Sequence, residues 1–257
     1  RQANNATAFI EQAERILQKR IEIVAGREEA RLIYLGVSHT LADEGRRLVV
    51  DIGGGSTEFI IGEDFEPLAI ESLQMGCVAY TQRFFADGQI TVKAIDKATM
   101  AARQEVMAIA SAYRALGWHS VVGSSGTIKA ARQIMAQNGW ANAEGCITAE
   151  GLKQVREKIL SFKHVNELSI SGLKEDRRSI LPAGYAILQA VFDELELDVM
   201  TYSDGALREG VLYDMLGRFS HEDIRDRSAH ALLARHHVDN KQAHRVLETA
   251  DTFYHQV

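Results

Sequence analysis

The sequence predicts an α/β protein, because three short apolar segments each run into a turn of glycine and small polar residues. The segments cover residues 48–52, 120–122 and 198–202, and helical patterns lie between them. Residues 48–52 are almost continuously apolar, which is typical of a strand buried on both faces of a sheet. Ligands of open α/β sheets bind beyond the carboxyl ends of the strands. We therefore expect the three turns to converge on one binding site.

Local patterns predict the remaining elements. Gly26 is expected to end a short strand, and Glu28 and Glu29 stand in the first turn of the next helix, where the helix dipole favours acids. In chain order we expect a helix at 7–19, a strand at 21–24, a helix at 27–39, strands at 57–61 and 67–72, helices at 78–86 and 92–116, a helix ending near 137, helices at 148–162 and 184–195, a helix from 207, and a helical tail from 221.

Composition limits the functional classes. The 257 residues are 46% hydrophobic and 25% charged, as in a folded protein with a substantial core, and the net charge of −6 argues against a nucleic-acid-binding surface. No apolar run is long enough to span a bilayer, and no leader pattern opens the chain. Cys77 and Cys146 have no partner at metal-ligand spacing, so we expect free thiols in a cytoplasmic protein.

The stretch from Asp51 to Glu58, Asp-Ile-Gly-Gly-Gly-Ser-Thr-Glu, carries the most chemical information. Its glycines, Gly53, Gly54 and Gly55, let the backbone approach an anion with successive N–H groups, and Ser56 adds a hydroxyl donor. The two flanking carboxylates are hard oxygen ligands of the kind that Mg²⁺ prefers. A plain β-turn beside an acid would explain a bare triple glycine, but the full string after a buried strand favours a phosphate loop.

Two other turns have the same character with weaker signals. Residues 123–127, which include Gly126, join a strand to a helix N-terminus, where anions are favoured. Residues 203–210 form the third turn, in which Arg208 is either a phosphate ligand or a surface helix residue. Spacing alone favours helix-dipole compensation as the role of Glu28 and Glu29.

Five strings in order resemble the exopolyphosphatase and guanosine pentaphosphate phosphatase family. They are Gly26 to Tyr34, Leu48 to Glu58, Met75 to Val78, Gly123 to Thr127 and Ser203 to Tyr213. The resemblance spans nearly the whole chain and is closer to the exopolyphosphatases. It implies an actin-type fold, with ribonuclease-H-like lobes that contain a mixed sheet flanked by helices, and the start of an all-helical domain.

The resemblance also implies roles for individual residues. Glu29 is similar in position to the catalytic base that deprotonates the attacking water. Asp51 and Glu58 resemble the acids that hold Mg²⁺, and Gly53 to Ser56 resemble a phosphate-binding loop. Further phosphate ligands implied by position are Arg1, Gly126 and Arg177. The implied reaction is the release of terminal orthophosphate from polyphosphate, in a protein that is a homodimer at full length.

The resemblance implies a fragment. The family's first phosphate loop has no counterpart here, and the chain begins at Arg1. We expect residues 1–40 to end a first lobe, 41–217 to form a second lobe, and 218–257 to begin the helical domain. The isolated chain is accordingly expected to be nearly inactive.

Alternative functions remain open at this stage. Hydrolysis of guanosine pentaphosphate would use the same base and metal. A non-catalytic phosphate- or nucleotide-binding regulator is a second alternative, although a pure binder has no need of a base at Glu29. An α/β domain with glycine turns of no function is the third.

Overall fold

The computed structural model describes residues 5–41 and 45–219, together with residues 242, 245, 246, 249 and 253. Arg1 lies outside this part of the chain, as does nearly all of the helical domain predicted over residues 218–257. The three-part division of the chain stays a prediction.

The described residues form one mixed six-stranded sheet with the strand order β3-β2-β1-β4-β6-β5. Strands β1, β4 and β6 run parallel, whereas β2, β3 and β5 pair with antiparallel neighbours. The strands are β1 (Arg46–Ile52), β2 (Thr57–Glu63), β3 (Glu66–Leu73), β4 (Ser120–Ser124), β5 (Ile147–Thr148) and β6 (Val199–Tyr202).

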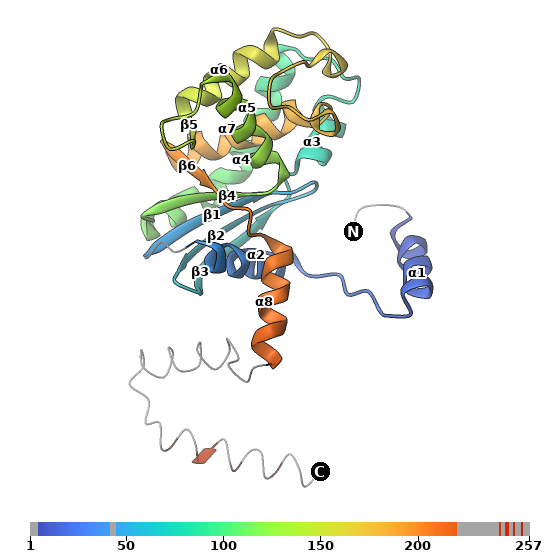
Figure 1. The fold of residues 1–257 in the computed structure, drawn as a ribbon, viewed down its shortest axis with the longest axis vertical. Coiled ribbons are helices and arrows are strands. Elements are labelled where there is room, and N and C mark those ends of the chain that lie inside the picture. The colour runs from blue at the N-terminus through green and yellow to red at the C-terminus, as the bar shows by residue number, and fades with distance from the viewer. Residues whose placement is uncertain are drawn as a thin grey trace.

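Helices cover both faces of this sheet (Figure 1). Helices α4 to α7 lie on one face and α2 lies on the other, while α1 stands apart at the end of an extended segment. The helices are α1 (Ala6–Leu17), α2 (Gly26–Thr40), α3 (Cys77–Phe84), α4 (Val92–Leu116), α5 (Gly126–Asn138), α6 (Ala149–Leu160), α7 (Leu181–Leu195) and α8 (Leu207–Phe219), with 3-10 turns at Val165–Glu167 and Glu175–Arg177. The predicted α/β class, with a mixed sheet between helices, is confirmed. None of the described helices is both long and apolar enough to cross a lipid bilayer.

The central strand β1 is buried on both faces, as its apolar run predicts. Leu48, Val50 and Ile52 belong to the larger core beneath α4 and α7, whereas Val49 belongs to the smaller core beneath α2. Successive side chains of a strand point to opposite faces, so a doubly covered strand needs apolar residues at every position.

The predicted strand at residues 21–24 is wrong. This segment has no regular structure, and the Ile21 N–H donates to the Glu14 carboxylate at 2.8 Å. Gly26 does not end a strand but is the first residue of α2. A segment of four residues with three apolar side chains does not define a strand unless it pairs with a sheet edge.

The predicted boundaries of other elements differ from the observed ones by a few residues. Helix α7 begins at Leu181 rather than at 184, because Pro182 fits the first turn of a helix, where no N–H partner is needed. The two-residue strand β5 was missed, since a pairing of that length leaves no periodic signal in the sequence.

Helix α2 is fixed by direct backbone packing against α8. A Cβ atom on Gly210 would overlap the carbonyl oxygen of Leu32, and one on Gly36 would overlap that of Ala206. Arg31 adds an ion pair to Asp214 of α8, with an N···O distance of 2.9 Å. These contacts matter for function because α2 carries Glu29 in its first turn.

Candidate active site at the strand ends

The three glycine-containing turns do converge on one edge of the sheet, as predicted. Asp51 at the end of β1 pairs with Ser124 at the end of β4, and Gly123 pairs with Tyr202 at the end of β6. The backbone N–H of Ser203 also donates to Gly123, at 3.0 Å. Parallel strands therefore bring turns more than seventy residues apart in sequence into register.

The loop from Gly53 to Ser56 is a tight turn whose carbonyl groups face α3. The N–H of Gly53 donates to Ser56 at 2.9 Å, and the first N–H groups of α3 donate to the carbonyls of Gly53 and Gly54 at 2.9–3.0 Å. A Cβ atom on Gly76 would overlap the backbone of Gly54 and Gly55, so only glycine lets α3 approach so closely.

The same loop leaves its amides available to a ligand. Within the described part of the chain, the backbone N–H groups of Gly54, Gly55 and Ser56 have no hydrogen-bond acceptor. Gly54 and Gly55 are exposed. Consecutive free amides are donors that can bind an anionic oxygen.

Two buried carboxyl groups lie behind the loop. Asp51 and Glu58 are register partners on β1 and β2, with exposed fractions of 9% and 1%. Burial raises the pKa of Asp51 to about 6, against a hydrogen bond with Ser124. Burial likewise raises the pKa of Glu58 to about 7, against hydrogen bonds with Ser56 and Ser72. Because desolvation disfavours the anions, the pair is poised to accept a cation or a proton.

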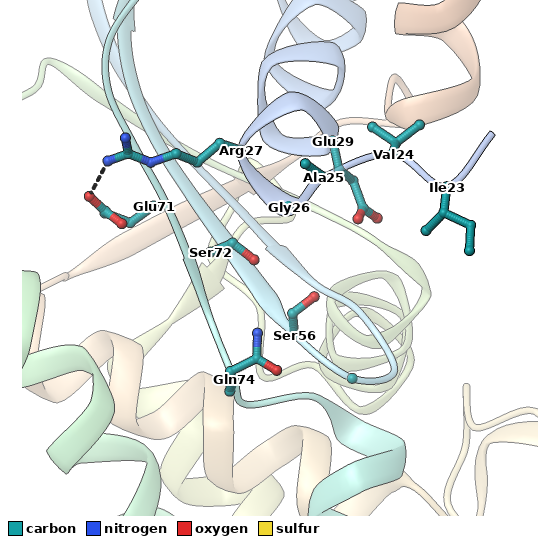
Figure 2. A pocket seen from close by; sticks show the side chains of 11 residues that line it. Ile23, Val24, Ala25, Gly26, Arg27, Glu29, Ser56, Glu71, Ser72 and Gln74 are labelled. Atoms are coloured by element: carbon teal, nitrogen blue, oxygen red, sulfur yellow. Dashed lines mark hydrogen bonds and ion pairs between the residues drawn. The ribbon is translucent and has the colours of Figure 1, made fainter. Parts of the chain in front are cut away.

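Glu29 faces the same space from α2. Its negative charge further raises the pKa values of both Asp51 and Glu58, which shows that the three acids lie in one electrostatic site. Figure 2 shows its carboxylate directed into a pocket with a volume of about 670 Å³, toward which Ser56 also points. The pocket is lined by Ile23, Val24, Ala25, Gly26, Arg27, Glu29, Gly55, Ser56, Glu71, Ser72 and Gln74.

The two neighbouring acids of α2 have different environments. Glu28 accepts two hydrogen bonds from Arg31, at 2.9 and 2.7 Å, on the solvated side of the helix. Glu29 instead lines the pocket. The surface role that spacing favours for both residues therefore applies to Glu28 and does not describe Glu29.

Gly126 and Arg177 lie together at the second turn, although they are far apart in sequence. A Cβ atom on Gly126 would come within 2.6–2.9 Å of the Arg177 guanidinium, which therefore lies over the N-terminus of α5. Ser125, the N-cap of α5, has a φ of 97°, a conformation that costs strain in any residue but glycine. A cation above a helix N-terminus suits an anionic ligand.

Arg208 of the third turn is exposed on α8, and Arg1 is outside the described residues.

Sequence patterns missed three residues that support the site. Ser72 donates to Glu58 at 2.9 Å from the adjacent strand, Ser124 bonds Asp51 from the parallel neighbour, and Gln74 lines the pocket. Each is an ordinary polar residue in its own segment. Only the strand register, Glu58 opposite Ser72 and Asp51 opposite Ser124, would have identified the first two.

The donor set fits a hard divalent cation that keeps several water ligands. Among the described residues no cluster of three His, Cys, Asp or Glu side chains is arranged to hold a metal ion. Two carboxylates with substrate phosphate and water are the usual Mg²⁺ environment, however. Burial raises the pKa values of Asp51 and Glu58 because it destabilises their anionic forms, and a bound cation would stabilise those forms.

A pH dependence of stability follows from these two carboxyl groups. Their ordinary pKa values of 3.8 and 4.5 rise to about 6 and about 7 in the folded chain. The folded state thus holds more protons on these two groups in this window, so their contribution to stability is greatest below it and falls as pH rises through it. In metal-free buffer we expect the Tm of an Asp51→Asn/Glu58→Gln variant to fall less than that of the wild type between about pH 4 and about pH 7. Parallel Tm profiles would contradict the assignment of these two pKa values.

Fold and site together define an α/β protein with a tight glycine loop at a strand end, two buried acids behind it and a further carboxylate facing a pocket. The model of the Ppx/GppA phosphatase family matches residues 1–219, and the chain belongs to this family.

Curated relatives carry two kinds of name. The chain is 42% identical over 257 residues to a guanosine-5'-triphosphate,3'-diphosphate pyrophosphatase of Vibrio campbellii, covering 100% of this chain and 51% of that protein. It is 47% identical over 229 residues to a Haemophilus influenzae protein with the provisional name exopolyphosphatase, covering 89% of this chain and 70% of that protein. The chain thus spans about half the length of the first relative.

Solved structures agree with the fold. A crystal structure of the Aquifex aeolicus member of the Ppx/GppA family has a TM-score of 0.69 and 26% identity, over 84% of this chain and 71% of that chain. An exopolyphosphatase from Cytophaga hutchinsonii has a TM-score of 0.71 and 24% identity, over 83% of this chain and 71% of that chain, and supports the fold alone.

Proposed function

We propose that the whole protein hydrolyses the terminal phosphoanhydride bond of inorganic polyphosphate and releases orthophosphate. The observation that carries this proposal is the position of Glu29, whose carboxylate faces a pocket that the phosphate loop also lines. A base opposite an anion site is the arrangement that an attack by water on a bound phosphate requires.

Each group has a distinct role in this reaction. The amides of Gly54, Gly55 and Ser56 bind oxygens of the terminal phosphate, and Glu29 orients a water molecule and takes its proton as the new P–O bond forms. The anhydride oxygen leaves with the remaining chain. Asp51 and Glu58 would hold Mg²⁺, directly or through water, and the ion would neutralise charge on the phosphates. Arg177 and Gly126 would bind a further phosphate.

The Arg27 guanidinium is not directed toward the centre of the pocket. It pairs with Glu71 at 2.8 Å and turns away from Glu29 and Ser56 (Figure 2). The positive charge for phosphates in this pocket is therefore expected from the metal ion, because Arg177 does not line the pocket.

Hydrolysis of guanosine pentaphosphate is the second candidate, and the name of the Vibrio campbellii relative favours it. It would use the same base, loop and cation. The described residues that line the pocket include no aromatic side chain on which guanine could stack. We propose polyphosphate as the first candidate, since it has no base that would need a stacking partner.

A competition experiment separates the two substrates. With the whole protein and Mg²⁺, we expect polyphosphate to be hydrolysed with a higher kcat/KM than guanosine pentaphosphate, and to inhibit its hydrolysis when both are present. The reverse order would make the nucleotide the substrate.

Omission of Mg²⁺ is expected to abolish either reaction. Addition of Mg²⁺ is expected to raise the Tm of the wild type but not that of Asp51→Asn/Glu58→Gln.

A further inference from the structure

A second, basic pocket lies at the far end of α3. Its volume is about 380 Å³, and it is lined by Arg83, Phe84, Thr91, Lys93, Ala94 and Lys97. We propose that this basic pocket binds the distal part of a polyphosphate chain whose terminal phosphate occupies the Gly53–Ser56 loop. The proposal rests on the proposed function and extends it to the length of the substrate.

The cations of the basic pocket are available to a ligand. Arg83, Lys93 and Lys97 are exposed, and none of them forms an ion pair with a carboxylate in the part of the chain that the structure describes. Several other basic side chains of the described chain are paired with acids, as Arg156 is with Asp96 at 2.7 Å. Lys93 and Lys97, together with Arg83, whose guanidinium lies over the Phe84 ring, make this hollow locally positive in a chain of net charge −6, which favours an anionic ligand.

Nearby acids do not neutralise this pocket. Asp96, one residue before Lys97, is held by Arg156 of α6. Asp87, in the loop between α3 and α4, accepts the backbone N–H of Gln89 at 3.0 Å. Both carboxylates are therefore engaged, and neither lines the pocket.

The backbone of the basic pocket is fixed by hydrogen bonds. The N–H of Ile90 donates to Lys163 at 2.7 Å, and that of Val165 donates to Gly88 at 2.9 Å. Thr91 caps α4 by accepting the N–H of Ala94, and the first turn of that helix adds a partial positive charge. Because this backbone is held in place, only the side chains of the pocket need to be ordered when a polyanion binds.

Helix α3 connects the two sites. Its first N–H groups bond the carbonyls of Gly53 and Gly54, and its last turn contributes Arg83 and Phe84 to the basic pocket. Eight residues of helix span about 12 Å. A long polyphosphate can occupy both ends of this helix at once, whereas a short chain held at the loop cannot. Simultaneous occupation would strengthen binding of long chains without any new contact at the loop.

The test measures binding by the 257-residue chain, by calorimetry with long-chain polyphosphate and with tripolyphosphate. We expect Lys93→Ala/Lys97→Ala to weaken long-chain binding about three- to tenfold, the range for two exposed charge pairs, and to leave tripolyphosphate binding unchanged. Lys153→Ala/Lys158→Ala on α6 removes the same charge elsewhere and is the matched control. The affinity of Lys93→Ala/Lys97→Ala for long chains should also depend less on salt concentration than that of the wild type, because fewer phosphates are neutralised.

The single substitution Arg83→Gln provides a second, independent variant, and it should also weaken the binding of long-chain polyphosphate. Equal long-chain affinity in the α4 variant and the α6 control would overturn the proposal, as would an equal loss for both ligands. If the wild type binds long chains through the basic pocket but tripolyphosphate not at all, the loop site of the proposed function fails and the basic pocket stands. If the wild type binds neither ligand, both fail.

Discussion

Substitution of Glu29 by Gln in the whole protein is expected to lower kcat for polyphosphate hydrolysis about 10²- to 10⁴-fold, the usual contribution of a general base. The amide keeps the shape of the side chain but cannot take a proton from water. In the proposed mechanism Glu29 acts on the nucleophile and not on the bound phosphate, so KM should change little. Steady-state kinetics with a phosphate-release assay measures both values.

Glu28→Gln is the matched control for this prediction. Glu28 is the preceding residue on the same helix turn, but it pairs with Arg31 and lies outside the pocket. Its loss should cost no more than an exposed ion pair, about 1 kcal/mol of stability or less, and leave kcat near the wild-type value. Equal activity of Glu29→Gln and wild type would remove the base and favour a non-catalytic phosphate-binding regulator.

Replacement of Gly76 by Ala should produce the second large effect, a loss of phosphate binding of at least about tenfold with destabilisation of about 1–3 kcal/mol. The added methyl group would overlap the backbone of Gly54 and Gly55, so either the loop or α3 must move. Displacement of the loop would turn its amides away from the anion. Thermal unfolding and calorimetric titration with tripolyphosphate measure the two effects separately.

Gln82→Ala provides the control on the same helix. Gln82 is exposed on α3 and does not line either pocket. This variant should match the wild type in Tm and in anion affinity. Wild-type affinity in Gly76→Ala would mean that the loop amides do not hold the ligand, whatever the stability of the variant.

The strongest sequence predictions came from segments with one dominant local constraint. The apolar run at residues 48–52 could satisfy only a strand covered on both faces, and it became the central strand β1. The glycine string after it allowed the close backbone turn that the structure shows at Gly53. The short segment at residues 21–24 had no such constraint, and it is not a strand.

The acidic residues at the start of α2 did not show from the sequence which of them faces the pocket. Glu28 and Glu29 occupy equivalent positions in the sequence, and the helix dipole favours both equally. Their separation into a surface ion pair and a pocket carboxylate depends on the rotation of α2 about its axis. That rotation is set by the contacts of Gly36 with α8 and of Gly26 with Ser72 of β3, which are distant in sequence.

The sequence by itself therefore determined the fold class, the tight turn at residues 53–56 and the two acids that flank it, Asp51 and Glu58, because each depends on residues that are neighbours in the chain. Only the tertiary structure decided that Ser72 and Ser124 support Glu58 and Asp51, that Arg177 lies over Gly126, and that α3 joins the loop to the basic pocket. Strand register and helix packing create these contacts, and both depend on burial across the whole core and not on any local pattern.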